Sequence, residues 1–348
     1  MANFDDFKLS VEALSGGTNT VVLDDVGMPS VMFVMPKYLS SELNINLNAT
    51  VHPAWKMNNA EKTKVYISKY QNIVMNNRAY SLPMQDPKAV ITFDAALAAC
   101  RAKGEYWGIT PMALWGAIAL WCKTNGTMPR GNNSYGKDYS YTFEKGVVIY
   151  NDGTNDCRTA TGSGPNSWNH NNAPDGIADL NGNVSEWCAG FRVVGGEIQV
   201  IPDADCMLSS CDMSANSTEW KAILQDGTLV APGTANTLKY DYVSNKWQLA
   251  TAITSQADSS RSCAFSAMQD GGLTVPQLLK ELAVFPADTA GYNSELFYLN
   301  NGAGLERFPC RGGGWFLASN AGVFCAHLGI ARTIASTSVG FRSAFYGA

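Results

Sequence analysis

Short runs of apolar residues near the start of the chain predict β-strands. Residues 20–23 end at a pair of aspartates, and residues 31–35 lie between a turn that contains glycine and proline and the breaker Pro36. β-Branched and apolar runs bounded in this way are typical of strands, and residues 65–70 give a further signal of the same kind. We therefore expect a small β-rich N-terminal unit over residues 1–55, which serves attachment or oligomerisation.

A helix is predicted to begin near Thr92. This residue suits the N-cap, and Asp94 in the first turn complements the helix dipole. Gly104 is a suitable stop. One apolar stripe at spacings of four and three residues supports the assignment, formed by Phe93, Leu97 and Cys100.

A second helix is predicted to begin at Thr110, the N-cap, with Pro111 at the first helical position. Asn125 and Gly126 end it. Its apolar face is broad, which indicates a well-buried helix. That face carries Leu114, Trp115, Ile118, Trp121 and Cys122.

Long stretches of the chain lack a regular pattern. Residues 129–183 are rich in Gly, Asn, Ser, Asp and Tyr, and so long an irregular stretch in a compact domain is functional or specially braced. Residues 203–305 have a mixed pattern with several turns, which indicates an insertion.

Composition excludes two broad classes. The chain has 348 residues, of which 46% are hydrophobic and 16% are charged, with a net charge of −5. This composition excludes a disordered chain. The acidic balance lacks the basic footprint of a nucleic-acid-binding protein. Low charge with many glycine and aromatic residues suits a surface that binds by shape and neutral hydrogen bonds.

The lack of a signal-peptide pattern and the number of cysteines together predict synthesis in a reducing cytoplasm. Residues 1–10 lack the basic start and apolar core of a signal peptide. The longest apolar stretches, residues 31–35 and 112–122, fall short of the roughly 20 residues that span a bilayer, so we expect no membrane insertion. The nine cysteines form an odd set, which favours reduced and mostly buried thiols.

Residue types that carry out catalysis are sparse. The chain has three histidines, His52, His170 and His327, and no two of them have the spacing of a local metal site. There is no phosphate-binding loop, no dinucleotide fingerprint after a strand and no nucleophile elbow. We therefore expect a protein without catalytic activity.

Three motifs in fixed order resemble a known fold family. Residues 179–187 read Asp-Leu-Asn-Gly-Asn-Val-Ser-Glu-Trp, residues 311–315 read Arg-Gly-Gly-Gly-Trp, and residues 340–343 read Gly-Phe-Arg-Ser. Together they resemble the formylglycine-generating-enzyme type of C-type lectin fold. The resemblance covers residues 60–200 and 305–348.

This resemblance implies an α+β, loop-rich, C-type lectin-like domain over residues 56–348, with an insertion at about 203–305. Relatives often bind calcium near the first motif, which implies a calcium site near Asn183 and Glu186. The alternative for these two residues is a turn whose polar groups are satisfied internally, and otherwise no cofactor is expected.

The oxidase members of the family bind copper through a pair of cysteines in the C-terminal segment. Here that segment holds Cys325 alone, and Cys310 lies upstream of the glycines. The sequence thus departs from the oxidase pattern. An oxidase with an atypical site is kept as an alternative to a binding protein.

Residues 315–339 resemble the variable region of proteins diversified by retroelements, such as phage tropism determinants. In that family an error-prone reverse transcriptase randomises adenines of a template rich in asparagine codons. By this resemblance eleven positions are variable and bind ligand, and the residues between them form a fixed framework. The eleven are Phe316, Leu317, Ser319, Asn320, Cys325, His327, Gly329, Ile330, Ile334, Ser336 and Ser338.

Variable and framework positions alternate over residues 325–329 and again over residues 334–339. In extended backbone such alternation places the two sets on opposite faces. We expect the framework residues, Leu328, Ala335 and Thr337 among them, to form a packed face. An ordinary C-terminal strand and loop is the alternative.

A backbone that carries variable side chains needs support from other residues. Gly312, Gly313 and Gly314 are expected to allow close backbone packing or a bulge. Arg332 and Arg342 are expected to bind backbone carbonyls or carboxylates inside the protein.

Together these observations favour a phage or prophage receptor-binding protein. It would contact a bacterial cell-surface protein or glycan, with homo-oligomeric display raising weak affinity through avidity. Its expected location is the virion tail after synthesis in the bacterial cytoplasm, with the bacterial cell surface as the alternative. A structural virion protein with a fixed partner is a further alternative.

Overall fold

The computed structural model describes residues 4–347, which form a mixed α+β protein with many short strands and few helices. The α-helices are α1 (Asp5–Leu14), α2 (Ser40–Leu43), α3 (Phe93–Arg101), α4 (Met112–Thr124) and α5 (Gln277–Glu281).

One sheet has five strands, in the order β1 (Asn19–Leu23), β2 (Pro29–Pro36), β5 (Lys64–Ser68), β23 (Ser343–Phe345) and β8 (Trp107–Ile109). Three small pairs stand apart. They are β3 (Lys56–Met57) with β4 (Ala60–Glu61), β6 (Ile73–Met75) with β7 (Arg78–Tyr80), and β9 (Val148–Asn151) with β10 (Asp156–Thr159).

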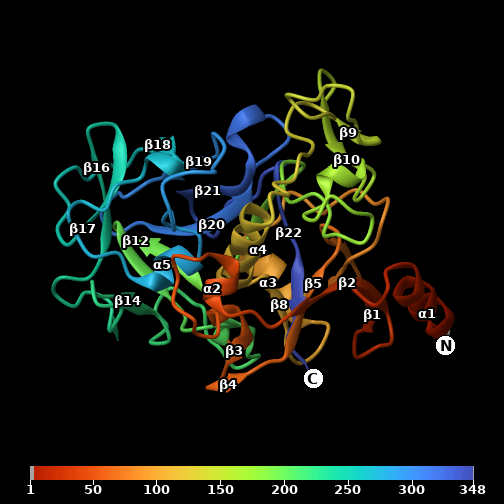
Figure 1. Ribbon diagram of the computed structural model, residues 1–348, viewed down its shortest axis with the longest axis horizontal. Helices are drawn as coiled ribbons and strands as arrows, with labels where there is room; N and C mark the ends of the chain where they lie inside the picture. Colours follow the sequence, from red (N-terminus) through yellow and green to blue (C-terminus); the bar gives the residue numbers. More distant parts are fainter. Residues whose placement is uncertain (1–3, 348) are drawn as a thin grey trace.

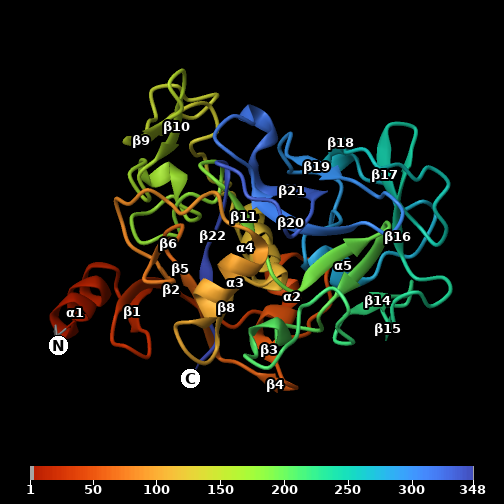
Figure 2. The same cartoon turned by 180° about the vertical axis from the view of Figure 1, so that it is seen from behind.

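The larger sheet follows the order β15 (Leu229–Val230), β14 (Lys221–Ile223), β13 (Glu197–Val200), β12 (Phe191–Val194), β20 (Glu306–Gly312), β21 (Gly322–Ile330), β19 (Leu296–Leu299) and β18 (Arg261–Ala264). Its branches are β11 (Ser185–Trp187), β22 (Val339–Phe341), β16 (Lys239–Val243) and β17 (Lys246–Ala250). In Figures 1 and 2, α1 lies at one end of the molecule and β16 and β17 at the other, with α3 and α4 between them.

The first 55 residues contribute the strand pair that their apolar pattern predicts. β1 pairs with β2, and β2 pairs with β5, which lies next to the C-terminal strand β23. The N-terminal strands therefore share a sheet with the end of the chain, and the strand pairing shows no boundary at residue 55. A role of this part in attachment or oligomerisation stays a prediction.

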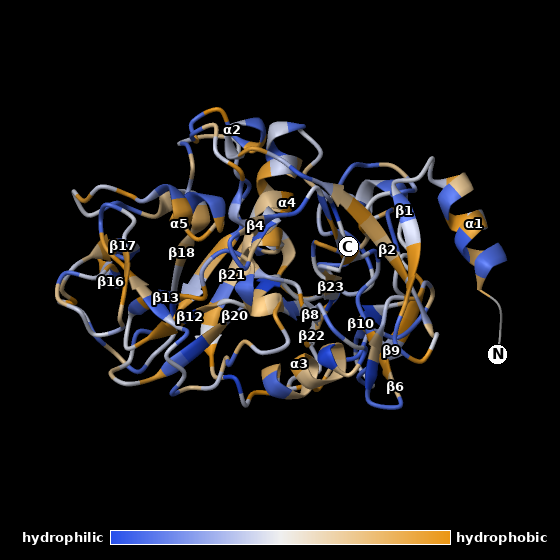
Figure 3. Ribbon diagram, turned by 90° about the horizontal axis from the view of Figure 1, so that it is seen from below, coloured by the Kyte–Doolittle hydropathy of each residue, from blue (hydrophilic) through white to orange (hydrophobic). Residues whose placement is uncertain are grey.

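The strand-rich interpretation of the N-terminal residues omits α1. Its apolar residues Phe7, Val11 and Leu14 recur at helical spacing and line a groove beside Tyr70. Two aspartates in its first turn interact favourably with the helix dipole. No residue of α1 is buried, and Figure 3 shows hydrophilic and hydrophobic residues along it. Because the helix packs at the edge of the fold, its apolar pattern is weak.

Both central helices form where they are predicted, with one correction. The side chain of Thr92 caps α3 by accepting a hydrogen bond from the backbone N–H of Ala95 at 3.2 Å. α4 begins one residue later than expected, with Pro111 rather than Thr110 at its N-cap. Thr110 instead donates from its backbone and its hydroxyl to the carbonyl of Arg342, both at 3.0 Å.

α4 is enclosed almost completely, since ten of its thirteen residues are buried. Gly116 allows the closest approach. A Cβ atom there would lie 2.2 Å from the carbonyl oxygen of Glu281, at the end of α5. The insertion that carries α5 is therefore packed directly on the central helix.

The irregular stretch over residues 129–183 is braced by buried asparagines. The side-chain oxygen of Asn183 accepts from the backbone N–H of Thr159 at 2.9 Å, and its amide donates to Gln71 at 2.9 Å. Asn132 donates to the carbonyl of Cys157 at 2.8 Å. These bonds take the place of a regular ladder and confirm that the stretch is specially braced.

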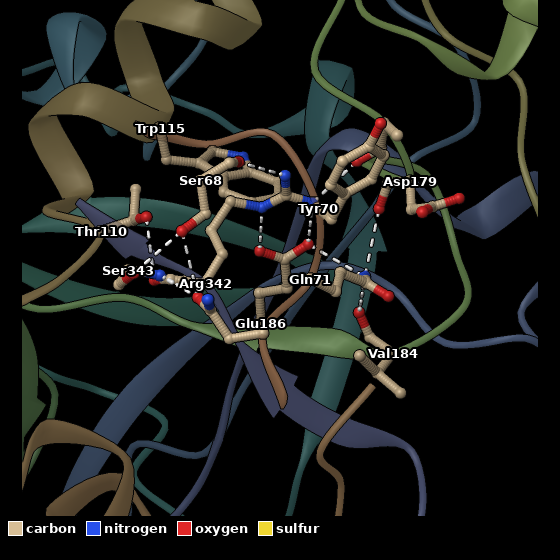
Figure 4. A network of polar contacts seen from close by, with 12 residues as sticks. Ser68, Tyr70, Gln71, Thr110, Trp115, Asp179, Val184, Glu186, Arg342 and Ser343 are labelled. Carbon is tan, nitrogen blue, oxygen red and sulfur yellow. Dashed lines mark hydrogen bonds and ion pairs between the residues drawn. The ribbon is translucent and has the colours of Figure 1, made fainter. Parts of the chain in front are cut away.

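A buried ion pair joins the two main sheets (Figure 4). Arg342, between β22 and β23, donates to both carboxylate oxygens of Glu186 on β11, at 2.6 and 2.7 Å. It also donates to the carbonyls of Ser68, Lys69 and Ala178 at 2.9, 3.2 and 2.9 Å. Both charged side chains are fully enclosed, which confirms the expected internal role of Arg342.

Gln71 extends this network to the first sequence motif. Its amide nitrogen donates to Glu186 at 3.0 Å and to the carbonyls of Asp179 and Val184 at 3.1 and 3.0 Å. The turn at residues 179–184 is thus held by the same set of polar groups as the C-terminal strands (Figure 4).

Arg342→Ala is expected to lower the free energy of unfolding by about 3–5 kcal/mol, because it leaves the Glu186 carboxylate buried without its partner. Urea denaturation measures the effect. Lys37→Ala is the control, since Lys37 pairs with Glu61 at 3.0 Å on the surface and its loss should cost less than about 1 kcal/mol. An unchanged melting temperature for Arg342→Ala would contradict the role of the pair.

Asp179→Asn is expected to stabilise the protein above pH 6. Burial raises the pKa of Asp179 to about 6, against the opposing effects of the hydrogen bond from Gly162 and the charge of Arg342. Between its ordinary pKa near 3.8 and about 6, the unfolded chain ionises while the folded protein does not, so stability falls as pH rises through this window. An asparagine side chain at position 179 can accept the same hydrogen bond from the backbone N–H of Gly162. It also tolerates the left-handed backbone at this position (φ 61°).

The expected gain from Asp179→Asn at pH 8 is up to about 3 kcal/mol, and it should shrink toward pH 4. Melting temperatures of both proteins from pH 4 to 8 test this. Parallel pH curves would show that Asp179 does not cause the dependence.

Candidate functional site

The segment over residues 315–339 runs along the centre of the larger sheet. It leaves β20 through the glycine turn, passes the short 3-10 helix Ala318–Asn320, forms β21 and returns through a loop to β22. β21 pairs antiparallel with β20 and parallel with β19. β22 pairs parallel with β11.

The glycine turn allows the close packing that its sequence predicts. Gly312 and Gly313 have φ values of 85° and 81°. A Cβ atom on Gly312 would lie 2.9 Å from the carbonyl oxygen of Leu180, so the turn packs against the first motif. The ladder also shifts register between Arg311 and Gly312, as in a bulge.

In β21 the predicted alternation is largely correct. Ala326 and Leu328 are fully buried, while His327 and Gly329 are partly exposed. Cys325 is the exception, because its side chain is only 2% exposed. It nevertheless lines the same cavity as His327, so it lies on the predicted ligand-binding face but in its buried part.

The alternation predicted over residues 334–339 is wrong for residues 334–338, because residues 331–338 form a loop. It forms no strand, and Ala335 and Thr337 are exposed rather than packed. Without a partner strand their side chains do not pack on the core, although Arg158 holds the backbone by donating to the carbonyl of Thr337 at 3.0 Å. Arg332 also fixes the loop, since it donates to the carboxylate of Asp94 on α3 and to the carbonyl of Met213 at 3.0 Å. The predicted carboxylate and carbonyl partners are therefore present, but the pair with Asp94 lies at the surface rather than inside the protein.

Eight of the eleven predicted variable residues line one cavity of about 440 Å³. The eight are Phe316, Leu317, Cys325, His327, Ile330, Ile334, Ser336 and Ser338. They come from the turn, from β21 and from the loop, so the fold brings together residues that lie up to 22 positions apart in the sequence (316 to 338).

Three predicted residues lie outside this cavity. Ser319 lines a smaller cavity of about 210 Å³ beside Tyr139 and Asn181. Asn320 is partly exposed but lines neither cavity. Gly329 lies under the ring of Tyr298, where a Cβ atom would be 3.1 Å from the ring.

Sequence reasoning missed several constant residues of the cavity. Leu296 and Tyr298 come from β19 in the insertion, and Ser185 comes from β11. The ring of Tyr298 stacks on His327 at 4.7 Å with an interplanar angle of 22°. The short apolar and aromatic run at residues 296–299 signals a strand, but its parallel pairing with β21 is a long-range feature that local patterns do not contain.

The cavity is electrically neutral. Its lining contains no acidic, lysine or arginine residue. Burial lowers the pKa of His327 to about 4 and raises the pKa of Cys325 to about 12. At neutral pH the imidazole is therefore uncharged and the thiol is protonated, so the cavity favours uncharged groups.

The residues near the first motif do not fit a calcium ion. Both oxygens of Glu186 accept hydrogen bonds from the guanidinium of Arg342, and the side-chain oxygen of Asn183 accepts from Thr159 and Asn132. A cation beside a buried guanidinium would be repelled. These residues instead form the internally satisfied turn that was the alternative.

Within residues 4–347, no cluster of three or more His, Cys, Asp or Glu side chains could hold a metal ion. Among the helices of that same range, none combines the length and the apolar character that crossing a bilayer requires.

No protein-family model and no curated protein matches the chain. Among solved structures, the chain is similar to Treponema denticola variable protein 1, with 11% sequence identity and a TM-score of 0.34. The alignment covers 94% of this chain and 98% of that chain. A TM-score of this size does not establish a common fold, so the function is inferred from the residues of the cavity.

His327→Ala and Leu328→Ala are expected to separate the two faces of β21. Leu328 is fully buried, and its truncation should cost about 2–5 kcal/mol of unfolding free energy. His327→Ala removes one stacked pair and should cost less than about 1.5 kcal/mol. Denaturant melts of both variants test this, and equal losses would contradict the division between variable and framework residues.

Proposed function

We propose that this protein is a non-enzymatic ligand-binding protein with a C-type lectin-like fold, whose segment over residues 315–339 is diversified by a retroelement. The observation that carries the proposal is the shared cavity, since eight of the eleven residues assigned as variable line it. Residues selected for an outside partner are expected on one accessible surface.

The support of the backbone favours the same proposal. Arg311 donates to the carbonyls of Ala283 and Val323, both at 3.1 Å, before the segment begins. Arg342 holds the chain after the segment ends. These anchors use residues outside the eleven positions, so the variable side chains are free to change while the backbone keeps its place.

The biological role proposed is that of a phage or prophage receptor-binding protein. Its ligand would be a bacterial cell-surface protein or glycan, and its location the virion tail, with the bacterial cell surface as the alternative. Homo-oligomeric display would raise weak affinity through avidity.

The DNA beside the gene tests diversification. We expect a nearby imperfect copy of the sequence that encodes residues 315–339, together with a reverse-transcriptase gene. The two copies should differ only where the copy carries adenine, and the differences should fall in the codons of the eleven positions.

The codons for Ala326 and Leu328 are the internal control, because both side chains are fully buried and changes there would disturb the core. A locus without the copy and the reverse transcriptase would refute diversification. That outcome would favour a structural virion protein with a fixed partner.

A further inference from the structure

The cavity in residues 315–339 is only partly built from variable positions. Leu296 and Tyr298 on β19 and Val339 on β22 form what we call the constant wall. The variable residues Phe316 and Ile334 line the same cavity and are its most exposed residues, with 46% and 42% of their surface exposed. Any ligand that enters meets apolar groups that diversification leaves unchanged.

The polar groups of the cavity are partly occupied by one another. The hydroxyl oxygens of Ser336 and Ser338 lie 3.1 Å apart and share a hydrogen bond. The ring of His327 stacks on that of Tyr298. A sugar needs many hydrogen-bonding partners, whereas most residues that line this cavity are apolar.

Size also restricts the ligand. Pockets for small ligands have volumes of about 300–1,000 Å³, and this cavity, at about 440 Å³, lies at the lower end. It would hold a single large side chain together with part of its neighbours. Exposed Phe316 and Ile334 would lose contact with water when such a group enters, which favours binding.

Tyr298 links the constant wall to two variable positions. Its ring stacks on His327, and it covers Gly329 so closely that a Cβ atom there would lie 3.1 Å from the ring and 2.8 Å from the hydroxyl of Ser260. A larger residue at position 329 therefore requires the Ser260 hydroxyl to move and the ring to shift by a few tenths of an ångström. Diversification at this position would adjust the ring slightly, and the cavity would still contain it.

From this geometry we infer that the cavity binds an uncharged aromatic side chain of a protein partner, packed against the ring of Tyr298. The inference rests on the proposed function, since it takes this cavity as the place where the ligand binds. The apolar and charge-free lining favours a protein side chain over a glycan as the ligand.

The test uses small molecules that carry single chemical features, added to the full-length protein. p-Cresol and 3-methylindole represent aromatic side chains, n-butylamine and butyrate represent charged side chains, and methyl α-D-glucopyranoside represents a glycan. We expect the two aromatic probes to bind with a Kd of about 1 mM. The other three should bind at least about tenfold more weakly, because the cavity offers no charge partner and its lining is mostly apolar. Titration by ligand-observed NMR measures both.

Two aspartate variants locate the binding. Ile334 and Thr333 are adjacent and exposed, and only Ile334 lines the cavity. Ile334→Asp should weaken p-cresol binding at least about tenfold, because a charged group at the rim resists loss of water. Thr333→Asp should leave it within about twofold.

Two variants of the constant wall test the role of the ring. Tyr298→Ala should weaken p-cresol binding at least about fivefold, and Tyr298→Phe, which keeps the ring, should retain it. Thermal melts of all four variants establish that each is folded.

Tighter binding of methyl glucopyranoside than of the aromatic probes would identify a glycan site and overturn the inference. Equal effects of the two aspartate variants, or no aromatic binding at 10 mM, about ten times the expected Kd, would overturn it as well. None of these outcomes alters the adenine pattern at the gene, so the inference can fail while the proposed function stands. A locus without that pattern would refute the proposed function whatever the probes do.

Discussion

The ion pair between Glu186 and Arg342 is the interaction on which the rest of the structure depends. Burying two charges is costly, and the cost is offset only where every hydrogen bond of both groups is made. Here the guanidinium meets the carboxylate on β11, two carbonyls at the end of β5 and directly after it, and one carbonyl in the braced stretch. One side chain therefore ties the five-stranded sheet, the irregular motif and the C-terminal strands together.

This constraint explains how a segment can vary without losing its shape. Residues 315–339 are held between Arg311 and Arg342, both fully buried. Both arginines donate to backbone carbonyls, which every amino acid possesses. Support through the backbone does not depend on side-chain identity within the segment, whereas support through packed side chains would. The framework residues Ala326 and Leu328 supply the packing that remains.

Local rules explain which features the sequence predicted. The β1–β2 strands, the cap at Thr92, the tight glycine turn and the two faces of β21 follow from spacing and backbone chemistry within a few residues. The burial of Cys325, the loop over residues 331–338 and the place of Tyr298 do not. Alternating residues lie on two opposite faces only where the chain is extended, and pairing with a neighbouring strand keeps it extended. Residues 331–338 have no such neighbouring strand. The parallel pairing of β19 with β21 joins an insertion to the variable segment, and no local pattern records it.

Under the proposed function, the same pairing of β19 with β21 limits what diversification can achieve. A site built wholly from variable residues could change its chemistry without restriction, but here β19 and β22 supply a wall of fixed apolar side chains. Variable residues, Cys325 and His327 among them, form much of the remaining lining, while Tyr298 and Leu296 keep one wall apolar. Under the proposed function, the insertion therefore supplies a fixed apolar wall, where a charged ligand group would lose its water without gaining a partner. The variable segment supplies the rest of the lining and so sets the remaining chemistry of the cavity.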